Sequence, residues 1–288
     1  MVSSRLIESS NSDVYWTTVI GSHEGMFDWK LVELWRCRDL ISLLVWRDFV
    51  ALYKQTILGP AWHIIQPLLT TLTFTVIFGK IAALPTNGSP PFLFYLTGNV
   101  LWGFFVGCLT KTAGTFTYNV GLLGKVYFHR MVIPISSILS TLISFGIQFA
   151  FFLIFWIFYW ATVRPNAWIL SAPVCVFMVA GYALGGGIII SALTTRYRDL
   201  AMLVSFGVQL LMFLTPVIYS VSGVPERYRW IVSLNPLSPI FEAYRSGFLG
   251  EGSVTVTQLA ISFGVMLVLL VVGLMLFARV EKTFMDTV

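Results

Sequence analysis

The chain has 288 residues, of which 57% are apolar and only 11% are charged. Soluble domains carry about 25% charged residues, so this composition excludes an ordinary water-soluble enzyme and indicates a protein embedded in lipid. The net charge of +5 has no basic cluster behind it that would suit nucleic acid, and we attribute it to cytoplasmic loops, where Lys and Arg accumulate in membrane proteins.

The 150 residues between Asp48 and Asp199 contain no Asp or Glu. A carboxylate is costly in hydrocarbon, so this stretch is suited to lipid. It also lacks the buried acids that serve as general bases, nucleophiles or metal ligands, and we expect no catalytic, cofactor or metal site in this chain. Cys37, Cys108 and Cys175 are odd in number and far apart, which predicts neither a disulfide framework nor a metal site.

Residues 1–30 form a polar N-terminal segment without the pattern of a cleavable signal, so insertion should depend on the internal apolar runs. Over residues 31–60 we predict an amphipathic helix in the membrane interface. Its apolar face would comprise Leu31, Leu34, Trp35, Ile41, Val45, Phe49 and Leu52, opposite Glu33, Arg36, Arg47 and Lys54. A core helix of a small soluble domain is the alternative, but residues 1–60 offer little else to build a core.

Six apolar stretches follow, each near or above the ~20 residues that cross a hydrocarbon core. They are Ile64–Ala83, Phe92–Leu109, Val132–Trp160, Ala167–Leu193, Leu200–Ser220 and Val256–Ala278. The sequence therefore predicts an all-α membrane protein with a six-span transmembrane domain over residues 61–280 and a cytoplasmic tail over 281–288. In the fourth stretch, small residues favour close helix packing, with a hinge as the alternative. These residues are Gly181, Gly185, Gly186 and Gly187.

Lys and Arg residues near the ends of these stretches divide unequally between the two sides of the membrane. One side has nine: Arg47, Lys54, Lys111, Lys125, Arg130, Arg196, Arg198, Arg279 and Lys282. The other has five: Lys80, Arg164, Arg227, Arg229 and Arg245. The more positive side faces the cytoplasm, and an even number of spans then places both termini there.

The segment 221–255 falls on the outer side and is too polar to span. Apolar residues nevertheless recur at helical spacing on both sides of Asn235-Pro236, and Ser238-Pro239 suits the start of a second helix. We predict two short outer re-entrant helices, which need shielding by protein or a water-filled cavity; a cap on the surface is the alternative. Their characteristic residues are Trp230, Asn235, Pro236, Phe241 and Tyr244.

Five motifs in order along the chain carry a family resemblance. They are Arg47-Asp48-Phe49 with Tyr53-Lys54, Leu58-Gly59-Pro60-Ala61-Trp62 and Gln66-Pro67-Leu68; Gly124-Lys125-Val126-Tyr127-Phe128-His129-Arg130 with Pro134; Arg196-Tyr197-Arg198-Asp199-Leu200; Pro216-Val217-Ile218-Tyr219; and Leu234-Asn235-Pro236-Leu237. Over residues 30–285 the chain resembles permeases of type-2 ABC transporters that export polysaccharides such as O-antigen or teichoic acid. It departs from their pattern at His129, where such permeases often carry Pro, and in its longer polar head before Phe27.

The resemblance implies a homodimer in the bacterial inner membrane that works with two copies of a cytoplasmic ABC ATPase subunit, which would hold ATP and Mg²⁺. The implied substrate is an O-antigen-like, polyprenyl-linked polysaccharide. Teichoic-acid or capsule polymers, or another amphiphile such as a drug or glycolipid, are the alternatives.

The sequence requires a separate motor independently of the resemblance. It contains no Gly-x-x-x-x-Gly-Lys-Ser/Thr loop that would bind ATP, so we expect a permease subunit and not an enzyme. It also lacks the intramembrane acids and histidines typical of ion-coupled transporters, and the paired cytoplasmic acids typical of a membrane glycosyltransferase. A channel or scaffold without a motor is the remaining alternative.

A path for sugar chains needs aromatic rings to stack on sugar faces, and hydroxyl or amide groups to bind sugar edges. Three sets of residues meet this requirement: Tyr95, Asn99 and Trp102; Ser137, Thr141, Ser144 and Gln148; and Gln209. Steps of three and four place each of the first two sets on one helix face. Hydrogen bonding between helices is the alternative role for such stripes.

The short cytoplasmic loops 119–134 and 194–199 are the expected contacts of the ATPase, because a push on a short loop moves the adjoining spans directly. The candidate contact residues are Lys125, Arg130, Arg196, Arg198 and Asp199. Enforcing topology is the alternative role of Arg196 and Arg198.

Overall fold

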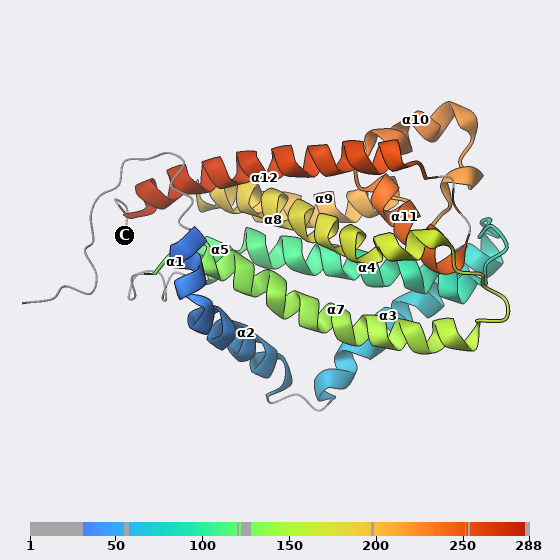
Figure 1. The fold of residues 1–288 in the computed structure, drawn as a ribbon, viewed down its shortest axis with the longest axis horizontal. Coiled ribbons are helices and arrows are strands. Elements are labelled where there is room, and N and C mark those ends of the chain that lie inside the picture. The colour runs from blue at the N-terminus through green and yellow to red at the C-terminus, as the bar shows by residue number, and fades with distance from the viewer. Residues whose placement is uncertain are drawn as a thin grey trace, which may run out of the picture. The chain divides into compact units, whose positions relative to one another are not determined.

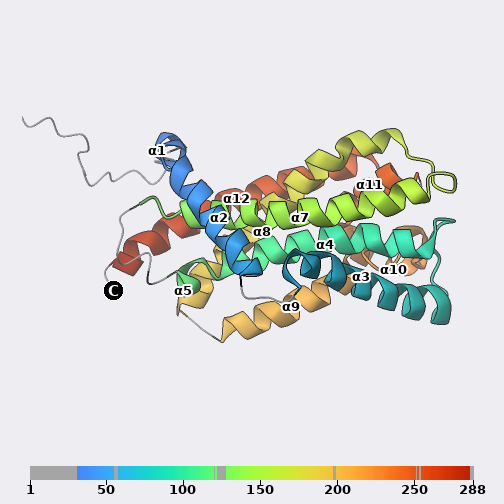
Figure 2. The same ribbon diagram turned by 90° about the horizontal axis from the view of Figure 1, so that it is seen from below.

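The computed structural model describes residues 31–54, 58–119, 121, 128–196, 199–250, 252 and 254–285. The chain divides into two compact units, Met1–Lys30 and Leu31–Val288, and the first, which holds the predicted polar head, lies outside the described residues. Every described element is a helix, which confirms the all-α prediction. Figures 1 and 2 show the long helices α4, α7, α8 and α12 side by side.

In chain order the elements are α1 (Leu31–Arg36), α2 (Arg38–Tyr53), η1 (Gly59–Ala61), α3 (Trp62–Phe74), η2 (Thr75–Ile81), α4 (Pro91–Ala113), α5 (Thr115–Tyr118), α7 (Val132–Phe158), η3 (Ala167–Ser171), α8 (Ala172–Arg196), α9 (Leu200–Leu214), η4 (Val221–Gly223), α10 (Glu226–Leu234), α11 (Ser238–Leu249) and α12 (Val256–Met285).

Five helical segments in the described part of the chain are long and apolar enough to cross a membrane. They are Trp62–Ile81, Pro91–Ala113, Val132–Phe158, Ala167–Thr194 and Val256–Arg279. They correspond to five of the six predicted stretches. The remaining stretch contains α9, whose 15 residues rise only about 22 Å, which is less than the ~30 Å thickness of the hydrocarbon core.

The predicted stretch Leu200–Ser220 is too long as a helix, because α9 ends at Leu214. Thr215 has an extended backbone, with φ −95° and ψ 137°. This conformation is expected before Pro216, because a proline ring disfavours helical backbone at the preceding residue. Apolar composition continues to Ser220 but does not extend the helix past this steric limit.

The helix predicted over residues 31–60 is broken at Cys37 into α1 and α2, and α2 ends at Tyr53. α2 packs on α7, and among the side chains of α2 whose burial is described, Leu44 is the buried one, at 3% exposed. The predicted apolar face is therefore only partly right, since Phe49 is half-buried but Trp35 is 71% exposed. The apolar residues of this segment follow the helical period only weakly. Packing against α7 therefore determines which face of α2 is buried.

α4 lies at the centre of the fold. It packs on α7, α8, α3 and α11, and 72% of its most apolar window is buried, a larger share than in any other described span. Pro91 is in its first turn, where a missing N–H costs no helical hydrogen bond. The hydrophobic core is therefore built around this one span, and residues on opposite faces of α4 can line different surfaces.

Glycines allow α8 and α12 to pack closely. A Cβ added to Gly185 would lie 3.0 Å from the Leu269 backbone, and a Cβ added to Gly273 would lie 2.8 Å from the Gly185 carbonyl oxygen. A Cβ on Gly181 would collide with the Met266 side chain. The predicted packing role of Gly181 and Gly185 is confirmed, and its partner is α12.

The outer segment forms two helices with the predicted boundary. α10 ends at Leu234 and α11 begins at Ser238, with Pro239 in its first turn. α11 is almost entirely buried and packs against η3, α8, α12 and α4, whereas most of α10 is exposed. α11 ends at Leu249 and is followed by Gly250, whose φ of 82° suits glycine; a Cβ there would collide with the Arg164 carbonyl.

Gly185→Leu should lower the thermal unfolding midpoint of the purified protein, because a side chain at this position must push the α12 backbone away. Overpacking of this kind costs about 1–3 kcal/mol. The matched control is Gly264→Leu on α12, where an added Cβ meets no atom within 4 Å. Thermal unfolding of both variants in the same detergent measures the difference, and equal midpoints would contradict the close approach of α8 and α12.

Candidate functional site

A cavity of about 670 Å³ lies between α4, α5, α8 and α9, and we name it the α9 hollow. Its polar side chains come from all four helices: Thr110, Thr117, Thr194, Ser205 and Gln209. Trp102 and Phe206 add aromatic rings. Two of the predicted path residues, Trp102 and Gln209, thus lie in one cavity although 107 positions separate them in the sequence.

A second cavity, of about 180 Å³, lies between α3, α4 and α7, and we name it the Lys111 groove. Its lining residues are His63, Gly103, Phe104, Gly107, Lys111, Thr141, Ser144, Phe145 and Gln148. It contains three of the four residues in the predicted third-span stripe. It also contains His63 and Lys111, neither of which the sequence indicated as a path residue. α4 separates the two cavities, with Trp102 lining one and Gly103 lining the other.

Tyr95 and Asn99 line neither cavity, and both are buried, at 0% and 9% exposed. The Asn99 amide donates to the Pro67 carbonyl at 3.2 Å and to the Thr71 hydroxyl at 3.3 Å, which joins α4 to α3. Tyr95 packs edge-on against Phe74. In this structure the two residues hold helices together, and a direct role in a path stays a prediction.

Ser137 is also buried and lines neither cavity. Its carbonyl accepts the Thr141 hydroxyl at 2.7 Å, a bond within α7. Ser144 similarly donates to the Ser140 carbonyl at 3.4 Å. The hydroxyl protons of Thr141 and Ser144 are therefore used within the helix, while their oxygen atoms face the Lys111 groove as acceptors.

Arg245 on α11 is 5% exposed and is surrounded by backbone carbonyls. It donates to Tyr219 at 3.1 Å, to Val217 at 3.0 Å and to Pro216, and its guanidinium lies 4.0 Å from the centroid of the Phe94 ring. All three carbonyls belong to the non-helical chain after α9, which has no helical donors of its own. Burial lowers the pKa of Arg245 to about 10, so it remains charged near neutral pH.

Sequence reasoning treated Arg245 only as an outer-side charge. One signal could have found its role: Arg245 lies four residues after Phe241 and three before Phe248, on the apolar face of its helix. An arginine on an apolar face needs buried acceptors. The acceptors come from residues 216–219, about 26 positions earlier, and no local pattern identifies them.

The predicted outer residues divide between core and surface. Phe241 and Tyr244 are buried, and Phe241 packs 6.0 Å from Trp102, measured between ring centroids. Asn235 donates to the Thr215 hydroxyl at 2.8 Å, and the Pro236 carbonyl accepts a hydrogen bond from Ser262. Trp230 on α10 is 60% exposed. α11 is therefore part of the core, and α10 presents apolar side chains outward.

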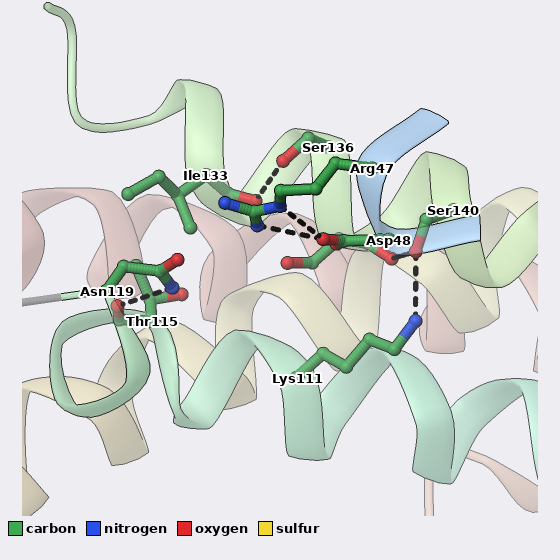
Figure 3. Close-up of polar contacts among 9 residues, drawn as sticks. Arg47, Asp48, Lys111, Thr115, Asn119, Ile133, Ser136 and Ser140 are labelled. Atoms are coloured by element: carbon green, nitrogen blue, oxygen red, sulfur yellow. Dashed lines mark hydrogen bonds and ion pairs between the residues drawn. The ribbon is translucent and has the colours of Figure 1, made fainter. Parts of the chain in front are cut away.

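At the other end of the spans, charged residues of α2 lie near α4 and α7 (Figure 3). Arg47 binds the Asp48 carboxylate, with N–O distances of 3.0 and 2.8 Å. Lys111 donates to the Ser140 hydroxyl at 2.9 Å. The hydrogen bond to Ser140 connects α4 with α7, and the Asp48 carboxylate of α2 acts on Lys111 at a longer range than an ion pair.

The other predicted cytoplasmic residues are spread along the chain. Arg36 and Lys54 on the N-terminal helices are exposed, as is Asp199 immediately before α9. Arg130 is only 6% exposed, which places it inside the fold before α7. The backbone of Arg196 ends α8. Lys125 and Arg198 lie outside the described residues.

Comparison with known proteins gives a consistent result. Residues 39–249 match the family described as ABC-2 type transporter. An O-antigen export system permease protein, RfbA, from Klebsiella pneumoniae is 27% identical over 251 residues, which is 86% of this chain and 94% of the relative. RfbA from Myxococcus xanthus is 26% identical, covering 75% and 82% of the two chains. The capsule polysaccharide export inner-membrane protein CtrC from Neisseria meningitidis is 24% identical, covering 85% and 92%.

Arg245→Met should destabilise the protein by about 3 kcal/mol, because it leaves three buried carbonyls without donors. Arg245→Lys should restore only part of this loss, since an ammonium group lacks the planar fork of a guanidinium. Arg229→Met is the control, because the Arg229 side chain lies on the same outer segment but is 44% exposed. Thermal unfolding in detergent measures all three, and a midpoint for Arg245→Met equal to that of the control would refute the role assigned to Arg245.

Proposed function

The chain belongs to the ABC-2 type transporter family, and we propose that it is the membrane-spanning subunit of an ATP-driven exporter of lipid-linked polysaccharide. The observation that carries this proposal is the alignment over nearly the whole length of an O-antigen export permease. Capsule export permeases align over a similar length at lower identity, which favours an O-antigen-like polymer. The cavity with Trp102 and Gln209 supports a sugar substrate, because it combines aromatic rings with hydroxyl and amide groups.

In this proposal the energy comes from two copies of a separate ABC ATPase that hold ATP and Mg²⁺, because the sequence has no phosphate-binding loop. The ATPase would contact the short cytoplasmic loops. The Asp199 side chain is exposed, which supports its role as a contact that the ATPase can reach. Arg130 is buried, so its contribution would be to hold the loop in place.

We further propose six membrane crossings with both termini in the cytoplasm of a bacterial inner-membrane protein. α9 would complete the sixth crossing together with residues 215–220, whose carbonyls are supplied with donors by Arg245. α2 would lie in the cytoplasmic interface, where its exposed Trp46 suits the headgroup region. α10 would enter the outer leaflet through Trp230 and Leu234, which are 60% and 71% exposed.

A homodimer would close the polymer path along α9. This helix packs only against α8 among the more extensive contacts in the described structure, and it exposes large apolar side chains on most of its surface, including Met202, Phe206 and Phe213. The α9 hollow opens beside these residues. A second copy facing α9 would turn two open cavities into one enclosed path.

Purified chain should show no ATP hydrolysis, and activity should appear only when a second polypeptide with a phosphate-binding loop is added.

In cells, deletion of the gene should remove polymer from the surface and leave lipid-linked polymer on the cytoplasmic side. Immunoblotting of surface polymer, with and without a complementing copy, measures this. Hydrolysis by the pure chain, or normal surface polymer after deletion, would contradict the proposed function.

Gln209→Leu should lower the amount of surface polymer several-fold while leaving expression unchanged, because it removes an amide from the α9 hollow without removing packing volume. Trp102→Ala is a weaker test, since Trp102 packs against Phe105 and Phe241 and its truncation would leave a cavity in the core. Gln66→Leu is the control, an exposed glutamine on α3 that lines neither cavity. Equal surface polymer in both variants would remove Gln209 from the path.

A further inference from the structure

The Lys111 groove has a cation at one end and a ladder of uncharged polar groups above it. Lys111 is in the last turn of α4, two residues before its end at Ala113, and His63 is at the start of α3. Both positions correspond to the cytoplasmic end of the spans in the proposed topology. From Thr141 to Gln148 the stripe continues for seven residues along α7, or about 10 Å toward the middle of the membrane.

The Lys111 side chain is directed into the protein and not toward bulk water. A lysine near the end of a span normally extends to the headgroups with its charge in water. Here the ammonium instead crosses to α7 and donates to Ser140 at 2.9 Å (Figure 3). An ammonium group has three donors, so this contact fixes its position and still leaves it able to bind a ligand in the groove.

The charge at this end of the groove is positive. Asp48 binds Arg47 at 2.8 Å and acts on Lys111 at a longer range than an ion pair. One carboxylate beside two cations leaves a net charge of +1 from these three groups. His63, which interacts electrostatically with Lys111, adds a further titratable group on the same side. The groove therefore offers a favourable potential to an anion.

The walls above Lys111 suit a sugar. Phe104 and Phe145 pack 4.9 Å apart, measured between ring centroids, and provide flat apolar surface. Thr141, Ser144 and Gln148 provide acceptors and an amide along one side. Gly103 on α4 faces Gln148 across the groove, since a Cβ added at Gly103 would lie 3.7 Å from the Gln148 side-chain oxygen, an ordinary van der Waals contact. Anion site and sugar-compatible wall are thus continuous.

We propose that the Lys111 groove binds the phosphate-bearing head of the lipid-linked substrate, with Lys111 on the phosphate and the α7 stripe on the first sugar. The proposal rests on the proposed function, because it assigns the carrier end of the same substrate to a site separate from the α9 hollow. It places the lipid-linked end between α3 and α7 and leaves the α9 hollow to the polymer.

The test measures binding of a fluorescently labelled farnesyl diphosphate to the purified full chain in lipid nanodiscs. The matching labelled farnesol, which lacks phosphate, reports apolar binding alone, and unlabelled inorganic pyrophosphate reports a free anion. Lys111→Met should lower the affinity for the diphosphate at least about tenfold, the loss expected for one charged hydrogen bond, and should leave farnesol binding unchanged. Lys111→Arg should retain affinity within about threefold.

Asp48→Asn separates ligand binding from a structural role of the cluster. Removing the shared carboxylate makes the groove more positive, so diphosphate affinity should rise about threefold or more even if the link between α2 and α4 is weakened. If these charged residues had only a structural role, Lys111→Met and Asp48→Asn would each lower both the stability of the protein and its affinity for the diphosphate. Lys80→Met is the control for loss of a lysine, since Lys80 is exposed at the far end of the span that contains α3.

Unchanged diphosphate affinity in Lys111→Met would overturn the proposal, as would a fall in affinity in Asp48→Asn. Inorganic pyrophosphate binding as tightly as the lipid diphosphate would also overturn it, because the groove would then be a site for free anions. A surface-polymer assay on the gene deletion distinguishes the two proposals. Lys111-dependent binding with normal surface polymer after deletion would support the groove and refute polysaccharide export; loss of polymer with Lys111-independent binding would do the reverse.

Discussion

A backbone carbonyl in hydrocarbon has no water to bind, so every interruption of a helix in a membrane needs a donor from the protein. The interruption after α9 depends on this constraint most strongly. Pro216 prevents helical backbone at Thr215, and the following carbonyls point toward α11, where Arg245 binds three of them. α11 must therefore be buried for α9 to be short. α11 is buried against α4, α8 and α12, and this burial places Arg245 where it can bind the carbonyls that follow the end of α9.

The same arrangement explains why α4 is central. Gly98 allows the Val217 carbonyl to approach, since a Cβ there would lie 2.7 Å from it, and Phe94 of the same helix supports the guanidinium of Arg245. Nearer the C-terminal end of α4, Gly107 allows α7 to approach, since a Cβ would lie 2.9 Å from the Thr141 side chain. Neighbours approach α4 closely at a glycine on both sides, the Val217 backbone at Gly98 and the Thr141 side chain at Gly107, and α4 forms the wall between the α9 hollow and the Lys111 groove. A transporter with a fixed wall can change one cavity without collapsing the other.

The sequence was sufficient wherever local physics decided the structure. Apolar length located five spans, and Pro239 marked the start of α11. It was insufficient where distant residues decided. The buried face of α2 depends on α7, and Asn99 looked like a path residue because its acceptors, Pro67 and Thr71, lie about 30 positions away on another helix. Lys111 was counted only as a topological charge, since its orientation toward Ser140 follows from tertiary packing. The stripe on α7 was found, but its cationic end was not.

Charge placement connects these features. The acid-free stretch from residue 49 to 198 keeps carboxylates, which would repel a phosphate or trap a cation, out of α3, α4, α7 and α8. Two cations of the fold, Arg245 and Lys111, use their donors to different extents. Arg245 on α11 binds three backbone carbonyls and lies against an aromatic ring, so most of its donors are used within the protein. Lys111 on α4 has one hydrogen bond, to a hydroxyl, and the Asp48 carboxylate, which binds Arg47, acts on it at longer range. An anion bound at Lys111 would meet only neutral hydroxyl, amide and aromatic groups further along the groove. In the proposed topology, where Lys111 lies on the cytoplasmic side, this order favours capture at Lys111 and weak retention beyond it.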